Sequence, residues 1–114
     1  MNQPNDLPLE IDIHAVHGLL KGASGMTLLD CREADEHSLV HIKEAKLLPM
    51  SELQARYAEL LPLKDQHLVV HCHHGGRSMR VTQWLREQGF TQVQSMAGGI
   101  DQWAVEIDKT LQRY

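Results

Sequence analysis

The sequence lacks the segments that export a protein or place it in a membrane. Residues 1–8 are polar, with neither the basic start nor the apolar stretch of a secretory signal peptide. No apolar run approaches the roughly 20 residues that a membrane-spanning helix needs. We therefore expect a cytoplasmic protein without membrane contact.

The chain also lacks an excess of positive charge and has little cysteine. Its 11 lysine and arginine residues face 15 aspartate and glutamate residues, for a net charge of −4. Nucleic-acid-binding surfaces need a clustered basic excess, so we expect no nucleic-acid partner. The two cysteines, Cys31 and Cys72, indicate free thiols rather than a disulfide framework, because no export signal accompanies them.

No internal repeat and no low-complexity tract divides the chain. Its 114 residues have the length of one domain, which can build a hydrophobic core without disulfides or metals. Residues 1–8 contain two prolines and otherwise mostly polar side chains, which predicts a flexible N-terminal arm. We expect residues 9–114 to form a single domain.

Short strands and amphipathic helices are predicted to alternate along this domain. Compact apolar runs at residues 26–31 and 67–72 are typical of buried strands. The other predicted elements are strands at 9–11, 46–49 and 93–96 and helices at 13–21, 33–39, 51–61, 77–88 and 99–108. The helix at 51–61 rests on a capping-box pattern, Ser51-x-x-Gln54. The alternation predicts an α/β fold with a mostly parallel sheet and helices on both faces.

Residues 69–78 combine several features that favour a negative charge at Cys72. A buried strand brings Cys72 to the carboxyl end of the sheet, where ligands bind in α/β folds. Gly75 and Gly76 let the following loop curl tightly, so that several backbone N–H groups can face one point. A helix begins directly afterwards, and its positive end and Arg77 face the same point. We therefore expect a site for an anion around the sulfur.

A thiol in such a field ionises easily. Helix N-termini and cations lower the pKa of cysteine from about 8.5 to roughly 3.5–7.5, and the thiolate is the nucleophile. The alternative is that Cys72 is a small buried side chain at the end of a strand, as free cysteines often are.

Three blocks of residues, in order along the chain, point to a family. They are Leu29-Asp30-Cys31-Arg32-Glu33 continuing through Glu36, His41-Ile42, Ala45 and Pro49; then Cys72-x-x-Gly75-x-Arg77-Ser78; and finally Gly98-Gly99-Ile100-x-x-Trp103. With these blocks, residues 10–107 resemble a single rhodanese-like domain. The family usually has valine or isoleucine where this chain has Cys31.

The resemblance implies a doubly wound parallel sheet and a thiosulfate sulfurtransferase that needs no cofactor. Cys72 would attack the outer sulfur of a donor such as thiosulfate, become a persulfide, and pass that sulfur to a thiol or cyanide. A protein persulfide partner also fits. The residues that would surround the substrate, mostly through backbone N–H groups, are His73, His74, Gly75, Gly76, Arg77 and Ser78.

Two other functions are compatible with the same fold. One is an interaction or regulatory module without turnover, although such a module often loses the cysteine that this chain retains. The other is a phosphatase or arsenate reductase. From Cys72 through Arg77 the loop has six residues, as in the sulfurtransferases, and the related phosphatases use one residue more. A phosphoryl group needs donors around three oxygens, whereas a persulfide adds one sulfur atom.

Several side chains near these motifs have more than one interpretation. Cys31 is either a resolving thiol for Cys72 or a core residue in place of valine. Asp30 and Arg32 either support the loop or form a structural ion pair. Ser78 either caps the loop or hydrogen-bonds the sulfur.

The histidines invite a metal hypothesis, which we do not favour. Residues 71–74 read His-Cys-His-His, and both residue types bind zinc. Adjacent residues in a tight loop rarely point at one ion, and no second ligand pair has a finger-like spacing. His14 and His17 are three residues apart on a predicted helix, where solvated or packed histidines are more usual. We expect no metal site, and His73 or His74 can instead tune Cys72.

Overall fold

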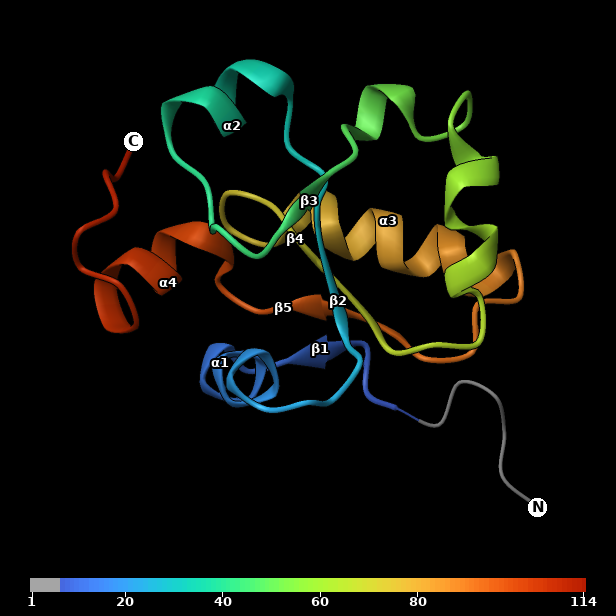
Figure 1. Cartoon of the computed structure of the whole chain (residues 1–114). Helices are drawn as coiled ribbons and strands as arrows, with labels where there is room; N and C mark the ends of the chain where they lie inside the picture. The colour runs from blue at the N-terminus through green and yellow to red at the C-terminus, as the bar shows by residue number, and fades with distance from the viewer. Residues whose placement is uncertain (1–6) are drawn as a thin grey trace.

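Five parallel strands form the central sheet, in the order β1-β5-β4-β2-β3 (Figure 1). The computed structural model describes residues 7–114. The strands are β1 (Glu10–Ile11), β2 (Thr27–Asp30), β3 (Lys46–Leu47), β4 (Leu68–His71) and β5 (Val93–Met96). The helices are α1 (Ile13–Lys21), α2 (Ala34–Leu39), α3 (Gly76–Glu87) and α4 (Gly99–Glu106), with 3-10 segments η1 (Met50–Glu52) and η2 (Tyr57–Leu63).

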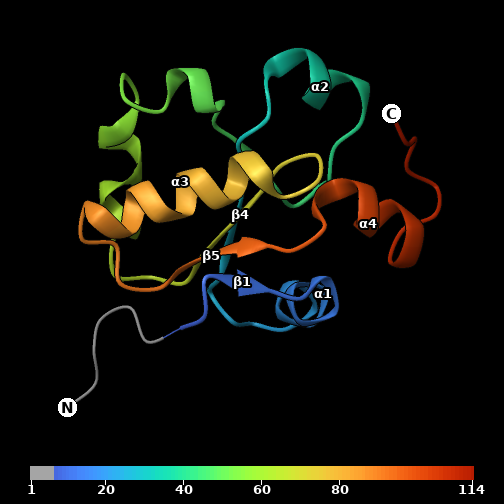
Figure 2. The ribbon, with the colours of Figure 1, turned by 180° about the vertical axis from the view of Figure 1, so that it is seen from behind.

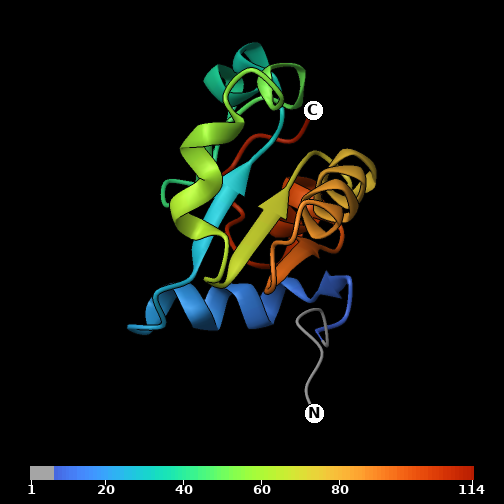
Figure 3. The same ribbon diagram turned by 90° about the vertical axis from the view of Figure 1, so that its right-hand side faces the viewer.

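The predicted α/β fold is confirmed, with every expected strand present and all of them parallel. The strands point toward the end of the molecule that carries α2 and the C-terminus (Figure 3). Within the described residues, no helix has the length and apolarity needed to cross a membrane.

The sheet has a hydrophobic core on each face, because successive side chains of a strand point to opposite sides. Leu29 and Val70 pack on the face covered by α3 and the 3-10 segments, and α3 lies over β4 and β5 (Figure 2). Leu28 and Val69 pack on the other face, against α1 and α4. Burying one such side chain fully contributes about 1.5–3 kcal/mol, so β2 and β4, whose residues are nearly all buried, contribute strongly to the stability of the domain.

The helix predicted at residues 51–61 is wrong. The chain forms two 3-10 segments there, separated by turns. The Ser51 hydroxyl donates a 2.6 Å hydrogen bond to the Glu33 carboxylate instead of capping a helix of its own. Pro62 lies inside η2, one residue beyond the predicted helix, and its ring disfavours the α conformation at the preceding residue.

The predicted N-terminal arm lies mostly outside the described residues. Its last two residues are described, and their carbonyl oxygens are bound by a helix on the body of the domain. Arg86 of α3 donates hydrogen bonds of 2.8 Å to Leu7 and 3.0 Å to Pro8.

Candidate active site

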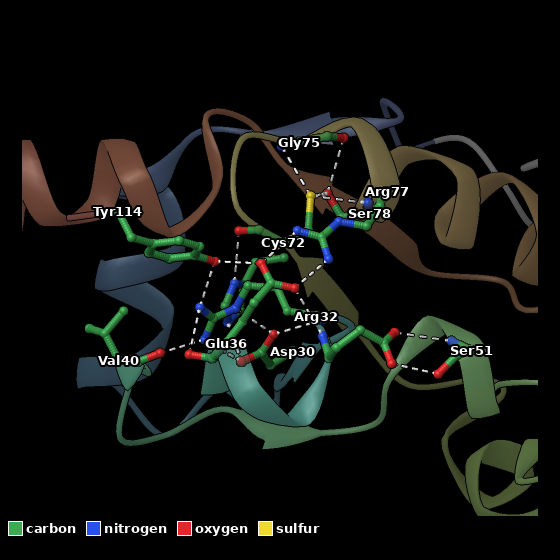
Figure 4. Close-up of polar contacts among 12 residues, drawn as sticks. Asp30, Arg32, Glu36, Val40, Ser51, Cys72, Gly75, Arg77, Ser78 and Tyr114 are labelled. Carbon is green, nitrogen blue, oxygen red and sulfur yellow. Dashed lines mark hydrogen bonds and ion pairs between the residues drawn. The ribbon is translucent and has the colours of Figure 1, made fainter. Parts of the chain in front are cut away.

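Cys72 lies directly after β4, where a short loop leads into α3. Its side chain is buried, and two backbone N–H groups donate to its sulfur, from Gly75 at 3.1 Å and from Ser78 at 3.3 Å (Figure 4). The Ser78 hydroxyl oxygen lies 3.4 Å from the sulfur and also donates to the Gly75 carbonyl at 3.2 Å. Of the two alternatives for Ser78, its hydroxyl donates within the loop, and its backbone N–H is the group that donates to the sulfur.

The curl of the loop depends on Gly75. This residue has a φ of +124°, which side chains with a Cβ atom rarely adopt. Because of this conformation, the Gly75 N–H turns back toward the sulfur just before α3 begins at Gly76. Two backbone donors, Gly75 and Ser78, therefore face the Cys72 sulfur.

These surroundings favour the ionised form of the thiol. Contact with the Cys31 side chain is the largest cause that lowers the pKa of Cys72, followed by hydrogen bonds from Ser78 and Gly75. Together they outweigh burial and bring the pKa of Cys72 to about 4. Cys72 is therefore a thiolate at neutral pH, the form that acts as a nucleophile.

Arg77 is held by α2. Its guanidinium donates two hydrogen bonds to the Glu36 carboxylate, of 2.6 and 2.9 Å. This pairing lowers the pKa of Glu36 to about 2, with the Arg77 hydrogen bonds as the largest cause, and raises the pKa of Arg77. The cation thus fixes the end of the loop to a helix far away in the sequence.

Tyr114 completes this side of the site. Its hydroxyl donates a 2.7 Å hydrogen bond to Glu36 and accepts a 2.9 Å bond from Arg32 (Figure 4). Its ring stacks on His73, with 3.8 Å between centroids and 5° between planes. A residue from the far end of the chain therefore contacts both α2 and the loop.

Asp30 and Arg32 form the predicted structural ion pair. Both side chains are fully buried, and two hydrogen bonds of 2.7 and 3.0 Å join them. Arg32 also donates to the Val40 carbonyl at 2.7 Å, so the pair connects β2 to the segment after α2. Burial raises the pKa of Asp30, but the hydrogen bonds from Arg32 and the neighbouring His71 oppose it, so the pKa is lowered overall.

The other side of the loop is held by the start of α4. The Ile100 N–H donates to the Cys72 carbonyl at 2.9 Å, and the Asp101 N–H donates to the His73 carbonyl at 3.1 Å. This approach is possible because Gly99 has no side chain. A Cβ atom there would lie 2.3 Å from the His73 oxygen and 2.6 Å from the Cys72 oxygen. The Gly-Gly turn thus also supports the candidate loop.

A surface hollow of about 320 Å³ opens over the loop. His74 is exposed at its rim, with its ring nitrogen 3.8 Å from the Asp101 carboxylate. Arg80 also lines a second hollow of about 290 Å³, between α3 and η1. The residues around the first hollow are Cys72, His73, His74, Gly76, Arg77 and Arg80.

Most of the predicted site residues therefore gather at the loop. Within residues 7–114, no three His, Cys, Asp or Glu side chains are arranged to hold a metal ion. Sequence reasoning did not single out Glu36, Gly99 or Tyr114 as site residues. The first two lie in the motif blocks, which was the only signal for them.

Residues 14–106 match the sequence profile of the rhodanese-like domain. The thiosulfate sulfurtransferase GlpE of Coxiella burnetii is 38% identical over 78 residues, which are 68% of this chain and 71% of that protein. The human single-domain sulfurtransferase TSTD1 has a similar structure, with a TM-score of 0.75 at 27% identity over 88% of this chain and 98% of that one.

Some relatives are longer. This chain is 29% identical to the rhodanese-like/PpiC domain-containing protein 12 of Arabidopsis thaliana over 92% of its own length, but it spans only 37% of that protein. The profile match covers most of the chain, and a solved relative has a similar overall fold. The chain therefore belongs to the rhodanese-like family.

Proposed function

We propose that this protein is a sulfurtransferase that carries a sulfane sulfur on Cys72, taken from a small donor such as thiosulfate. The observation that carries the proposal is the Cys72 sulfur itself, buried and bound by the backbone N–H groups of Gly75 and Ser78 at the start of α3. The relative GlpE, which is named a thiosulfate sulfurtransferase, supports the same donor class.

In the first step, the Cys72 thiolate attacks the outer sulfur of thiosulfate. A sulfur–sulfur bond forms, the bond within thiosulfate breaks, and sulfite leaves with the electron pair. The pKa of about 4 makes the thiolate available at neutral pH. The persulfide anion then lies at the positive end of α3, which favours negative charge.

In the second step, an acceptor thiolate or cyanide attacks the outer sulfur. Cys72 leaves as a thiolate, and its low pKa makes it a good leaving group. The exposed rim at His74 leaves room for the acceptor to approach. The loop residues His73, Gly76 and Arg77 shape the hollow through which it would reach the persulfide.

The reaction predicts a burst of sulfite, one equivalent per protein, when thiosulfate is added without an acceptor. Added cyanide should turn the burst into steady formation of thiocyanate. The Cys72→Ser variant keeps a small polar side chain, should fold, and should give neither product. A folded wild type that releases no sulfite would contradict thiosulfate as the donor. Hydrolysis of an aryl phosphate that depends on Cys72 would overturn the substrate class.

A further inference from the structure

Cys31 lies beside Cys72 on the neighbouring strand. Asp30 of β2 pairs in register with His71 of β4. The residues that follow them, Cys31 and Cys72, are therefore neighbours at the ends of the two strands. The Cys31 N–H donates a 3.0 Å hydrogen bond to the His71 carbonyl, so the two strands are still paired where the cysteines follow. Neighbouring strands are about 4.8 Å apart, within the roughly 4.4–6.8 Å between Cα atoms that disulfides need.

Both thiols also point into the same core. Cys31 and Cys72 are each 1% exposed and belong to the cluster under α3, on one face of the sheet. Contact with Cys72 is the largest cause that raises the pKa of Cys31, so Cys31 keeps its proton while Cys72 is ionised. The sulfur-loading step uses Cys72, which leaves a second, protonated thiol in contact with it.

We propose that Cys31 is an internal acceptor that resolves the Cys72 persulfide, forming a Cys31–Cys72 disulfide and releasing hydrosulfide. The Cys31 sulfur attacks the inner sulfur, which is the Cys72 sulfur at the end of the neighbouring strand. The bond between the inner and outer sulfur breaks, and the outer sulfur leaves with the electron pair. The Cys31 proton goes to the departing sulfur.

The reaction needs no oxidant besides the persulfide. The outer sulfur is reduced to sulfide, and the two cysteine sulfurs are oxidised to the disulfide. This proposal depends on the proposed function only for the origin of the Cys72 persulfide. It adds a second fate for the stored sulfur, because an external acceptor competes with Cys31 for the same persulfide.

The disulfide also defines what must happen next. It removes both thiols, so the site cannot take another sulfur until a thiol or dithiol reductant opens the bond. Resolution should be slow relative to transfer to a good acceptor, since Cys31 is protonated and buried away from solvent bases. The site would then release sulfide mainly when acceptors are scarce.

Packing alone predicts a different result. As a core residue in place of valine, Cys31 would fill space among apolar side chains, and Cys31→Val would leave the fate of the persulfide unchanged. The decisive comparison is between wild type, Cys31→Val and Cys31→Ser. The serine variant keeps a polar hydrogen-bonding group next to Cys72 and cannot form a disulfide.

The test uses the full chain with stoichiometric thiosulfate and no added thiol, followed by intact mass, sulfite and sulfide. Wild type should gain one sulfur and then convert to a form lighter than the starting protein by two hydrogens, with one equivalent of sulfide. Peptide mapping should join Cys31 to Cys72. Both Cys31 variants should keep the added sulfur and release no sulfide. A wild-type persulfide as long-lived as that of Cys31→Val would overturn the proposal.

A second way of loading separates this proposal from the proposed function. Inorganic polysulfide places a sulfane sulfur on reactive thiolates without the thiosulfate reaction. If thiosulfate gives no sulfite with any variant, the proposed donor is wrong, and polysulfide loading decides the role of Cys31. Disulfide and sulfide from wild type, with a stable persulfide in Cys31→Val, support internal resolution. Equal stability of the two persulfides, or unmodified thiols that persist in both proteins, counts against it.

Discussion

The loop that holds Cys72 is fixed from two sides by different kinds of contact. On the α4 side, backbone meets backbone, through the N–H groups of Ile100 and Asp101 and the carbonyls of Cys72 and His73. On the α2 side, side chains hold the loop, through the paired hydrogen bonds between Glu36 and Arg77. We name these the backbone wall and the side-chain wall.

The two walls should respond differently to their surroundings. The backbone wall contains no titratable group in its contacts and depends on the missing side chain of Gly99. The side-chain wall depends on charge, and α2 buries none of its own side chains. Ion pairs open to solvent weaken with salt and acid, whereas backbone hydrogen bonds do so much less. The walls therefore combine a rigid support with an adjustable one.

The largest effect should come from filling the space at Gly99. In Gly99→Ala the new methyl group meets two carbonyl oxygens of the loop, and the φ of +60° is strained for alanine. Strain of about 1–2 kcal/mol and the loss of two hydrogen bonds worth roughly 1 kcal/mol each should lower the free energy of unfolding by about 3–4 kcal/mol. Urea denaturation measures the change, and the sulfite burst should fall with it.

Gly18→Ala is the matched control for this substitution. Gly18 lies in the exposed part of α1, and a Cβ atom there meets nothing within 4 Å. Alanine favours a helix over glycine by about 0.5–1 kcal/mol, so this variant should be slightly more stable than wild type. Equal losses in the two variants would mean that the close approach at Gly99 contributes nothing.

A smaller effect should follow from removing the charge of the side-chain wall. Glu36→Gln keeps the shape of the side chain but replaces the ion pair with Arg77. We expect a loss of about 1 kcal/mol in the free energy of unfolding, because solvent partly screens this pair. The loss should shrink in high salt, whereas that of Gly99→Ala should not. Equal salt dependence of the two losses would contradict the division into two walls.

The same pair gives a signature in acid. The pKa of Glu36 is lowered to about 2, chiefly by the hydrogen bonds from Arg77. A group with a depressed folded pKa contributes stability above its unfolded value of about 4.3, and this contribution is lost as the pH falls toward 2. The difference between wild type and Glu36→Gln should therefore be largest near neutral pH and disappear between about pH 5 and pH 2. A difference that stays constant over this range would mean that the charge of Glu36 has no part in the wall.

The sequence predicts the strands that carry the site better than the contacts of either wall, for a physical reason. The strands at 26–31 and 67–72 are local patterns, and the second brings Cys72 to the correct end of the sheet. Glu36 and Arg77 are 41 residues apart, and no local pattern joins them. The failed helix at 51–61 has the same origin, since Ser51 uses its hydroxyl on Glu33, 18 residues away.

The smallest effect should come from Tyr114, which contacts the side-chain wall and the loop through different parts of its side chain. Tyr114→Phe loses the hydrogen bonds to Glu36 and from Arg32 but keeps the ring stacked on His73. Because Tyr114 is 39% exposed, we expect a loss of only about 0.5 kcal/mol, or roughly 2–4 °C in Tm. Tyr114→Ala also removes the ring stacking on His73. The rate at which iodoacetamide modifies Cys72 should fall in this variant, but by less than it falls in Gly99→Ala. If Tyr114→Phe lowers the free energy of unfolding as much as Glu36→Gln does, then the Tyr114 hydroxyl rather than Arg77 holds Glu36. The side-chain wall would then be formed by Tyr114 and Glu36.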